Sequence, residues 1–178
     1  MQELLDLVDK DDHVIGQMPR PEVHARKLSN YRVVNAFIIN DNGELWIPRR
    51  TKDKDRFPLC LDASAAGHVM AGETYQEAFA RELMEEVCIN IASKGYILMG
   101  ALNPFKHQTG AFMEVYCIKS NDVPDYNHED FIEYYWLTPH DLLKAIERGE
   151  AVKPDLPIIM REFFLGRIDI QKGLAKKA

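Results

Sequence analysis

The 178-residue sequence has few cysteines, no long apolar run and no surplus of basic residues. Its three cysteines, Cys60, Cys88 and Cys117, are scattered and include no Cys-x-x-Cys pair, which argues against a disulfide framework and a zinc site. No apolar run approaches the roughly 18–20 residues of a membrane span. Residues 1–3 lack the basic start of a secretory signal. These absences predict a cytoplasmic protein with no membrane partner.

Acidic residues outnumber basic residues by 28 to 22, so the net charge is −6. Proteins that bind duplex nucleic acid usually show the opposite balance, which disfavours nucleic acid as the main partner. A local basic patch can still hold a phosphorylated small molecule. The hydrophobic fraction of 46% and the length are typical of one ordinary globular domain.

Hydrophobic periodicity and turn residues predict strands mixed with helices along one chain. Strands are predicted over 4–8, 13–15, 32–40, 44–48, 96–102, 111–118 and 131–137, and helices over 21–28, 74–87, 139–147 and 157–164. Pro48 has no amide proton, so its strand should lie at a sheet edge or end there. The pattern indicates an α/β (α+β) fold of α/β/α layers. We expect a short β extension over 1–30 packed on the core, a domain over 31–170 and a flexible basic tail over 171–178.

The helix predicted over 74–87 carries the most chemical information. Thr74 and Glu77 have the spacing of a capping box, which fixes its start. At about 100° per residue, its apolar side chains share one arc that should face the sheet. The adjoining arc carries three acids, Glu82, Glu85 and Glu86.

Three carboxylates at this spacing repel one another. A hard divalent cation removes the repulsion, and Mg²⁺ prefers a few carboxylate oxygens together with water and phosphate oxygens. The alternative is a solvated acidic face with Arg81 as its partner. Charge spacing alone favours that second interpretation.

A longer motif changes the balance. Gly67, Glu73, the run Arg81-Glu-Leu-Met-Glu-Glu and Ile89 match the Nudix box in order and spacing. The sequence therefore resembles the Nudix hydrolase superfamily. Cys88 stands where the family has a glycine that ends the helix, a position that favours a left-handed backbone.

Further segments resemble the branch of this superfamily near isopentenyl-diphosphate isomerase. They include 5–9, 48–50, 54–55, 57–58 and 136–139. The resemblance implies the Nudix fold, a mixed sheet between helices, and hydrolysis of the pyrophosphate linkage of a nucleoside di- or triphosphate or of a nucleoside diphosphate joined to another group. The expected partner is thus a small phosphorylated molecule, and we expect it to be a nucleotide.

The resemblance also implies roles for individual residues. Glu82, Glu85 and Glu86 would bind Mg²⁺ or Mn²⁺, and a carbonyl near Gly67 would add a ligand. The metal would activate the attacking water. Arg81 would orient carboxylates through a salt bridge to Glu73.

The group that removes the proton from the water is left open. Some family members use a glutamate of the box, and others use an acid from a later loop. Glu129 and Asp130 lie in such a polar stretch, and an ordinary acidic loop is an equal alternative for this pair.

Substrate contacts are predicted outside the box. Arg50 and Lys54 belong to a basic cluster that can grip phosphate, although a solvated loop is the alternative. Glu114 alternates onto the face of a strand that also carries Phe112 and Tyr116, and should point into the cleft rather than to solvent.

Two other functions compete with hydrolysis. The isomerases use a cysteine where this sequence has Ala66, and Tyr31 stands where they have a metal-binding histidine beside His24, so isomerase activity is disfavoured. A catalytically silent nucleotide-binding domain is the second alternative, although such domains usually lose box carboxylates that are present here. The N-terminal hairpin is a surface through which a homodimer could form.

Overall fold

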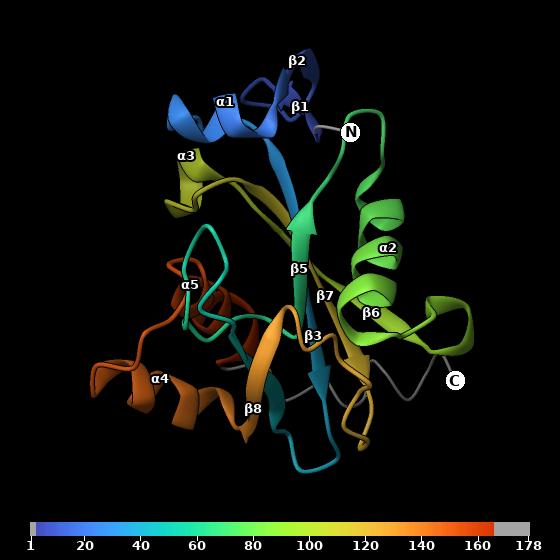
Figure 1. Ribbon diagram of the computed structural model, residues 1–178, viewed down its shortest axis with the longest axis vertical. Coiled ribbons are helices and arrows are strands. Elements are labelled where there is room, and N and C mark those ends of the chain that lie inside the picture. The colour runs from blue at the N-terminus through green and yellow to red at the C-terminus, as the bar shows by residue number, and fades with distance from the viewer. Residues whose placement is uncertain (1–2, 166–178) are drawn as a thin grey trace.

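The computed structural model describes residues 3–165, and its centre is a six-stranded mixed sheet (Figure 1). The elements follow in the order β1 (Leu4–Val8), β2 (Val14–Pro19), α1 (Arg20–Ala25), β3 (Arg32–Ile39), β4 (Leu45–Arg50), β5 (Ala65–His68), α2 (Tyr75–Val87), η1 (Ile91–Ser93), β6 (Tyr96–Leu102), α3 (Pro104–His107), β7 (Phe112–Lys119), β8 (Phe131–Leu137), α4 (Pro139–Glu147), α5 (Leu156–Ile159) and η2 (Met160–Phe164). No helix within this part of the chain is long and apolar enough to cross a membrane.

The main sheet has the order β6-β7-β3-β4-β8, and β5 adds to β3. β3 runs parallel to β7, whereas the other pairs are antiparallel. One apolar core lies between the sheet and α2, and a second lies between the sheet and the helices α4, α5 and η2. Helices therefore cover both faces, which confirms the predicted mixed α/β/α architecture.

The segment before β3 forms its own two-stranded sheet, β1-β2, as the hairpin pattern predicts. Leu5 and Val23 pack with Tyr31 and Ala111 in a small third cluster that joins this sheet to the domain. Ile15 on β2 is 65% exposed. A homodimer formed through this hairpin stays a prediction, and the predicted tail lies outside the described residues.

Helix α2 has both ends that its sequence predicts. The Thr74 hydroxyl accepts the Glu77 amide, and the Glu77 carboxylate accepts the Thr74 amide in return, which completes the capping box. At the other end, Cys88 has φ of 52° in the left-handed region. The cysteine thus adopts the conformation expected of the family's glycine.

The prediction for Pro48 is wrong. Its strand continues to Arg50, and β4 lies between β3 and β8. The Pro48 carbonyl accepts the Asp62 amide at 3.0 Å, so the nitrogen on the same side of the strand faces the 60–62 segment, away from β8. β3 pairs with β4 at Ile39 and Leu45, and beside Pro48 the loop segment takes the place of β3. Proline is tolerated because no β3 carbonyl needs a proton from its nitrogen. The short helices α3 and η1 were not expected, and the predicted last helix is divided into α5 and the π-helical turn η2.

Candidate active site

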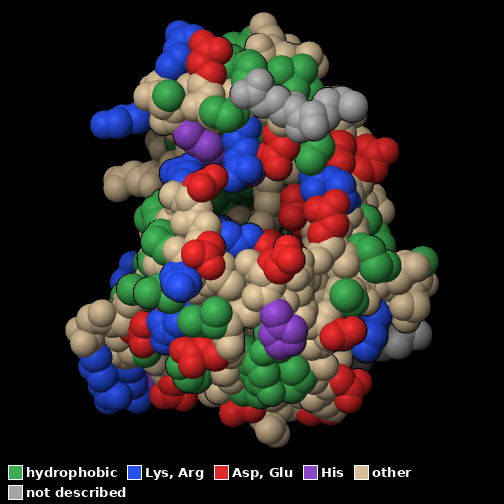
Figure 2. Space-filling model, viewed as in Figure 1, with side chains coloured by type: hydrophobic (Ala, Val, Ile, Leu, Met, Phe, Trp, Pro, Cys, Tyr) green, Lys and Arg blue, Asp and Glu red, His purple; other side chains and the backbone are tan. Residues whose placement is uncertain are grey.

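A cavity of about 780 Å³ lies beside β5 and the carboxylate-bearing face of α2. Figure 2 shows the hollow bordered by both acidic and basic side chains. Pockets of roughly 300–1,000 Å³ suit small ligands of nucleotide size. Glu82, Glu85 and Glu86 all line this cavity, as do Lys54 and Asp130. The structure therefore gathers acids and bases from distant parts of the sequence around one space.

Glu86 is the most deeply buried of the three box acids. The residue is 8% exposed, and its carboxylate accepts the amide of Ala66 at 2.8 Å. Burial, together with the neighbouring charge of Glu82, raises the pKa of Glu86 to about 8. Burial also raises the pKa of Glu82. A cation in the cavity would stabilise the charged form of both groups.

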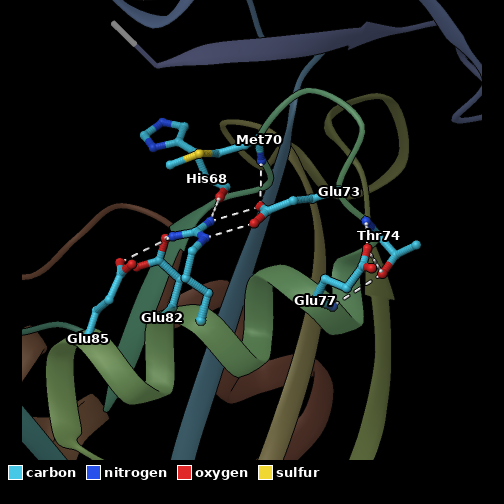
Figure 3. Close-up of polar contacts among 8 residues, drawn as sticks. His68, Met70, Glu73, Thr74, Glu77, Glu82 and Glu85 are labelled. Carbon is cyan, nitrogen blue, oxygen red and sulfur yellow. Dashed lines mark hydrogen bonds and ion pairs between the residues drawn. The ribbon is translucent and has the colours of Figure 1, made fainter. Parts of the chain in front are cut away.

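Hydrogen bonds from the Arg81 guanidinium connect Glu73, Glu82 and Glu85, three of the acids labelled in Figure 3. The guanidinium donates to Glu73 at 2.8 and 2.9 Å, to Glu82 at 2.6 Å and to Glu85 at 3.3 Å. It also donates to the His68 carbonyl at 2.9 Å. The predicted Arg81–Glu73 salt bridge is confirmed, and it ties the box helix to the turn before it.

Gly67 makes room for Glu82. A Cβ atom at this position would lie 1.9 Å from the Glu82 Oε1 atom, so no other residue fits while the carboxylate lies against β5. The glycine of the box therefore has a steric role that the structure displays directly. Its predicted role as a carbonyl ligand stays a prediction.

The three box acids have the chemistry of a site for Mg²⁺ or Mn²⁺, both of which prefer carboxylate oxygen. Their oxygens do not converge on one point, because Glu82 and Glu85 contact Arg81 whereas Glu86 contacts Ala66. Among residues 3–165, one group of at least three His, Cys, Asp or Glu side chains brings its potential ligand atoms within 4.8 Å of one another, and it comprises Asp9, Asp11 and His13.

That group near the N-terminus is explained by its turn. The Asp9 carboxylate accepts the amides of Asp11 at 2.8 Å and His13 at 3.0 Å, which closes the connection between β1 and β2. These side chains are mostly exposed. The box acids thus remain the predicted metal ligands, and they line the cavity.

The two acids of the later loop differ in position. Asp130 lines the cavity and forms an ion pair with Lys54. Glu129 is exposed, and its carbonyl accepts the Thr51 hydroxyl at 3.1 Å. The structure therefore brings Asp130 and Lys54 to the site and leaves the Glu129 carboxylate outside the cavity lining.

Arg50 lines the cavity, but its guanidinium is already bound within the protein. It donates to Asp62 at 2.8 Å and to the carbonyls of Arg56 and Phe57, each at 3.1 Å. These contacts hold the 56–57 loop on β4. A contact between Arg50 and a substrate phosphate would compete with these three hydrogen bonds. The sequence did not predict them.

Glu114 does not occupy its predicted place. It is half-buried on β7, accepts a hydrogen bond from the Tyr116 hydroxyl and is absent from the residues that line the cavity. The alternation along the strand was correct, because Glu114 shares a face with Tyr116, which packs in the core beneath α2. The α2 helix, rather than the cavity, covers that face.

Two residues that sequence reasoning missed also line the cavity, Asn35 and Asp155. Asn35 is a polar residue within the apolar strand β3, and this interruption was the available signal. Asp155 precedes α5 without capping it; its carboxylate instead accepts the Gly110 amide at 2.9 Å. Asp155 lies far from the box in the sequence, and no local pattern connects it to the site.

Comparison with known proteins agrees with this geometry. The family profile of the NUDIX domain matches residues 30–159. An uncharacterised Nudix hydrolase from Nostoc sp. is 48% identical over 162 residues, which are 91% of this chain and 96% of the relative. A crystal structure from Deinococcus radiodurans is 42% identical with a TM-score of 0.87, over 91% of this chain and 99% of that chain.

Isomerase relatives are more distant. An isopentenyl-diphosphate Delta-isomerase from Mycolicibacterium vanbaalenii is 24% identical over 160 residues, which are 85% of this chain and 86% of the relative. Members of the Nudix hydrolases act on pyrophosphate bonds of small phosphorylated molecules and use divalent metals, which suits the acids and cations around this cavity. The box motif, the mixed sheet and these similarities together show that the chain belongs to the Nudix hydrolase family.

Proposed function

We propose that this protein is a divalent-metal-dependent hydrolase that cleaves the pyrophosphate linkage of a nucleoside di- or triphosphate, or of a nucleoside diphosphate joined to another group. One observation carries the proposal: Glu86 is buried at the wall of a nucleotide-sized cavity with one amide as its partner. A buried carboxylate without a cation is costly, and Glu82 and Glu85 line the same space.

Glu82, Glu85 and Glu86 would hold Mg²⁺ or Mn²⁺, which when bound neutralises phosphate charge and lowers the pKa of water. Asp130 is the acid we assign to proton removal from the attacking water, because it lines the cavity from a separate loop. Its ion pair with Lys54 holds its carboxylate in a fixed orientation. Glu85 is 57% exposed and able to turn into the cavity, so it is the alternative base.

Lys54 is the side chain that we assign to the substrate phosphates. It reaches the cavity from the loop after β4, and its side chain is 26% exposed. Arg50 instead holds this loop in place through its contacts with Asp62 and the 56–57 backbone. A phosphate would thus approach between Lys54 and the box acids.

The isomerase alternative lacks its chemical groups. Ala66 offers no thiol beside the Glu86 carboxylate. Tyr31 stacks on His68 with ring centroids 5.6 Å apart, and burial lowers the pKa of His68 to about 3 and of His24 to about 4. The cluster of His24, Tyr31 and His68 is uncharged. Its Tyr31 phenol stands where a third histidine would be needed to match the isomerase site.

The test is a panel of nucleoside diphosphates, triphosphates and nucleotide sugars incubated with the purified protein and Mg²⁺ or Mn²⁺. We expect release of phosphate or nucleoside monophosphate from at least one compound, and loss of that release on adding a chelator. Conversion of isopentenyl diphosphate to dimethylallyl diphosphate would support the isomerase instead. Silence across the panel together with tight binding of one nucleotide would support the non-catalytic alternative.

A further inference from the structure

The cavity extends beyond the box acids, across β5 to β3. Asn35 pairs with Ala66 in the antiparallel β3–β5 register, so both side chains lie on the same face with Cβ atoms about 4.5–5.5 Å apart. The Ala66 amide, on the outer edge of β5, donates to Glu86. Asn35 is therefore separated from the acidic wall by one narrow strand whose side chains here are a methyl group and a hydrogen.

Asn35 has an unused hydrogen-bonding capacity. The residue is 5% exposed and lines the cavity. Its Nδ2 atom donates to the Met113 sulfur at 3.6 Å, which is a weak acceptor. Within residues 3–165, its carboxamide forms no hydrogen bond to nitrogen or oxygen. Buried amides normally have such partners. The Asn35 carboxamide is not among the fully buried groups that lack a partner, so it is open to a group in the cavity.

The surroundings indicate what kind of group would supply it. The cationic side chains Lys54 and Lys153 are paired with Asp130 and Asp62 toward the loop after β4. Around Asn35, the same-face neighbours on β3 and the register partner on β7 are apolar, Val33, Phe37 and Val115. A neutral carboxamide in such a place both donates and accepts, which suits a hydroxyl or a base edge better than a phosphate.

The cavity wall also has a second acceptor. The Asp155 carboxylate accepts the Gly110 amide through Oδ1, and its Oδ2 atom lies at the same wall without an ion-pair partner among the described residues. An acceptor of this kind binds hydroxyl or amine donors and repels phosphate. On the β3 side of β5, the cavity lining thus offers hydrogen-bonding groups besides the box acids, namely a carboxamide and a further carboxylate.

We propose that Asn35 is a specificity-determining residue that hydrogen-bonds the uncharged part of the substrate, namely the sugar hydroxyls or base edge of a nucleoside attached to the pyrophosphate. This inference rests on the proposed function, because the box acids define where the pyrophosphate lies. Asn35 contacts the nucleoside next to the pyrophosphate linkage and takes no part in breaking that linkage. The competing explanation is that Asn35 only packs against Met113.

The test uses Asn35→Leu, with Asn40→Leu as a matched control. Asn40 is 8% exposed and thus about as buried as Asn35, but its carboxamide is fully used in the turn after β3, where it accepts the Glu44 amide at 2.9 Å and donates to the Glu44 carboxylate at 2.7 Å. Binding of ADP, CDP, GDP, UDP and inorganic pyrophosphate is measured by calorimetry with Ca²⁺, alongside the melting temperature.

For Asn35→Leu we expect an unchanged or higher melting temperature. Binding of the preferred nucleoside diphosphate should weaken about ten- to a hundredfold, with pyrophosphate binding unchanged. Asn40→Leu should lower the melting temperature and leave the ratio of the two affinities intact. Equal weakening of both ligands by Asn35→Leu, no weakening, or a wild-type protein that binds pyrophosphate as well as every nucleotide would overturn the proposal. Because the readout is binding, absent hydrolysis in the wild type would count against the proposed function alone.

Discussion

The two ends of helix α2 are built from the same residue type in opposite ways. At the start, Glu77 and Thr74 satisfy each other's polar groups, and Glu73 takes two hydrogen bonds from Arg81. Near the end, Glu86 is more deeply buried, yet one amide is its partner and its pKa is raised. A glutamate thus stabilises the fold at one end and is held at a cost at the other.

On the proposed function, the difference separates acids that serve folding from acids that serve chemistry. Polar groups that hydrogen-bond one another within the chain contribute stability and need no ligand. A carboxylate whose pKa is raised at the wall of a cavity is typical of a functional site. Mutations at the two ends should therefore separate stability from activity.

The largest effect is expected from Glu86→Gln. The substituted amide keeps the shape of the side chain and can still accept the Ala66 amide, but the change removes a negative charge from the proposed metal site. We expect turnover of the identified substrate to fall by at least about a hundredfold, since a lost metal ligand removes the chemistry that the metal supplies. Unfolding by heat should occur at the same or a higher temperature, because burial penalises the charged carboxylate.

Glu77→Gln is the matched control at the other end of α2. It makes the same chemical change in a carboxylate that caps the helix and lies outside the cavity lining. Turnover should be unchanged, with a small loss of thermal stability. Equal activity losses in the two variants would mean that the ends of α2 do not differ in function.

Arg81→Lys should have the next largest effect. Lysine cannot reproduce the forked contacts to Glu73, Glu82 and the His68 carbonyl, so we expect a loss of about 1–3 kcal/mol in the free energy of unfolding at pH 7. Activity should fall too, because Glu82 loses its orienting partner. Chemical denaturation and initial rates measure the two effects.

The same variant has a defined pH dependence. The Arg81 hydrogen bonds lower the pKa of Glu73 below 4.5 in the folded protein. A carboxyl with a depressed folded pKa contributes stability above its unfolded pKa and loses it as pH falls through the folded value. The stability gap between wild type and Arg81→Lys should therefore narrow as the pH falls below about 4.5. A gap that stays constant down to about pH 3 would show that Glu73 is not the partner that matters.

Local patterns allowed most of the fold and the box to be predicted. The capping residues of α2 and its apolar arc depend on residues close together in the sequence, where spacing determines geometry, and the Arg81–Glu73 pair was implied by the resemblance to the box. β8 and α4 were predicted with their observed bounds for the same reason. Sequence patterns are informative over such distances because the interacting residues lie within one element or next to it.

The predictions that failed concerned residues whose surroundings are set by packing between segments distant in the sequence. Glu114 lies on the predicted face of its strand, but only the three-dimensional arrangement shows that α2 covers that face. Arg50 is occupied by Asp62 and by a loop whose path the sequence does not specify. Asn35 was overlooked because one amide in an apolar strand becomes informative only when it is seen without a strong partner beside a cavity.

A smaller change tests the stable end of α2 directly. Thr74→Ala removes the hydroxyl that accepts the Glu77 amide, and such a loss typically costs about 1 kcal/mol. Thr74→Ser should restore most of it. Turnover should match the wild type throughout, as the cap lies outside the cavity lining. A drop in activity without a drop in stability would mean that Thr74 serves function rather than stability.

The smallest effect is expected at Cys88, which closes the other end of α2. Its φ of 52° is strained for a residue with a side chain, and its amide donates to the Leu83 carbonyl. Cys88→Gly should raise the free energy of unfolding by a few tenths to about 1 kcal/mol, since relief of strain is partly offset by the greater entropy of an unfolded glycine. Because the backbone already holds the geometry that a glycine would take, kcat should not change. A large rise in kcat would instead mean that this cysteine distorts the turn after Glu86, and that the two ends of the helix are coupled through its last residue.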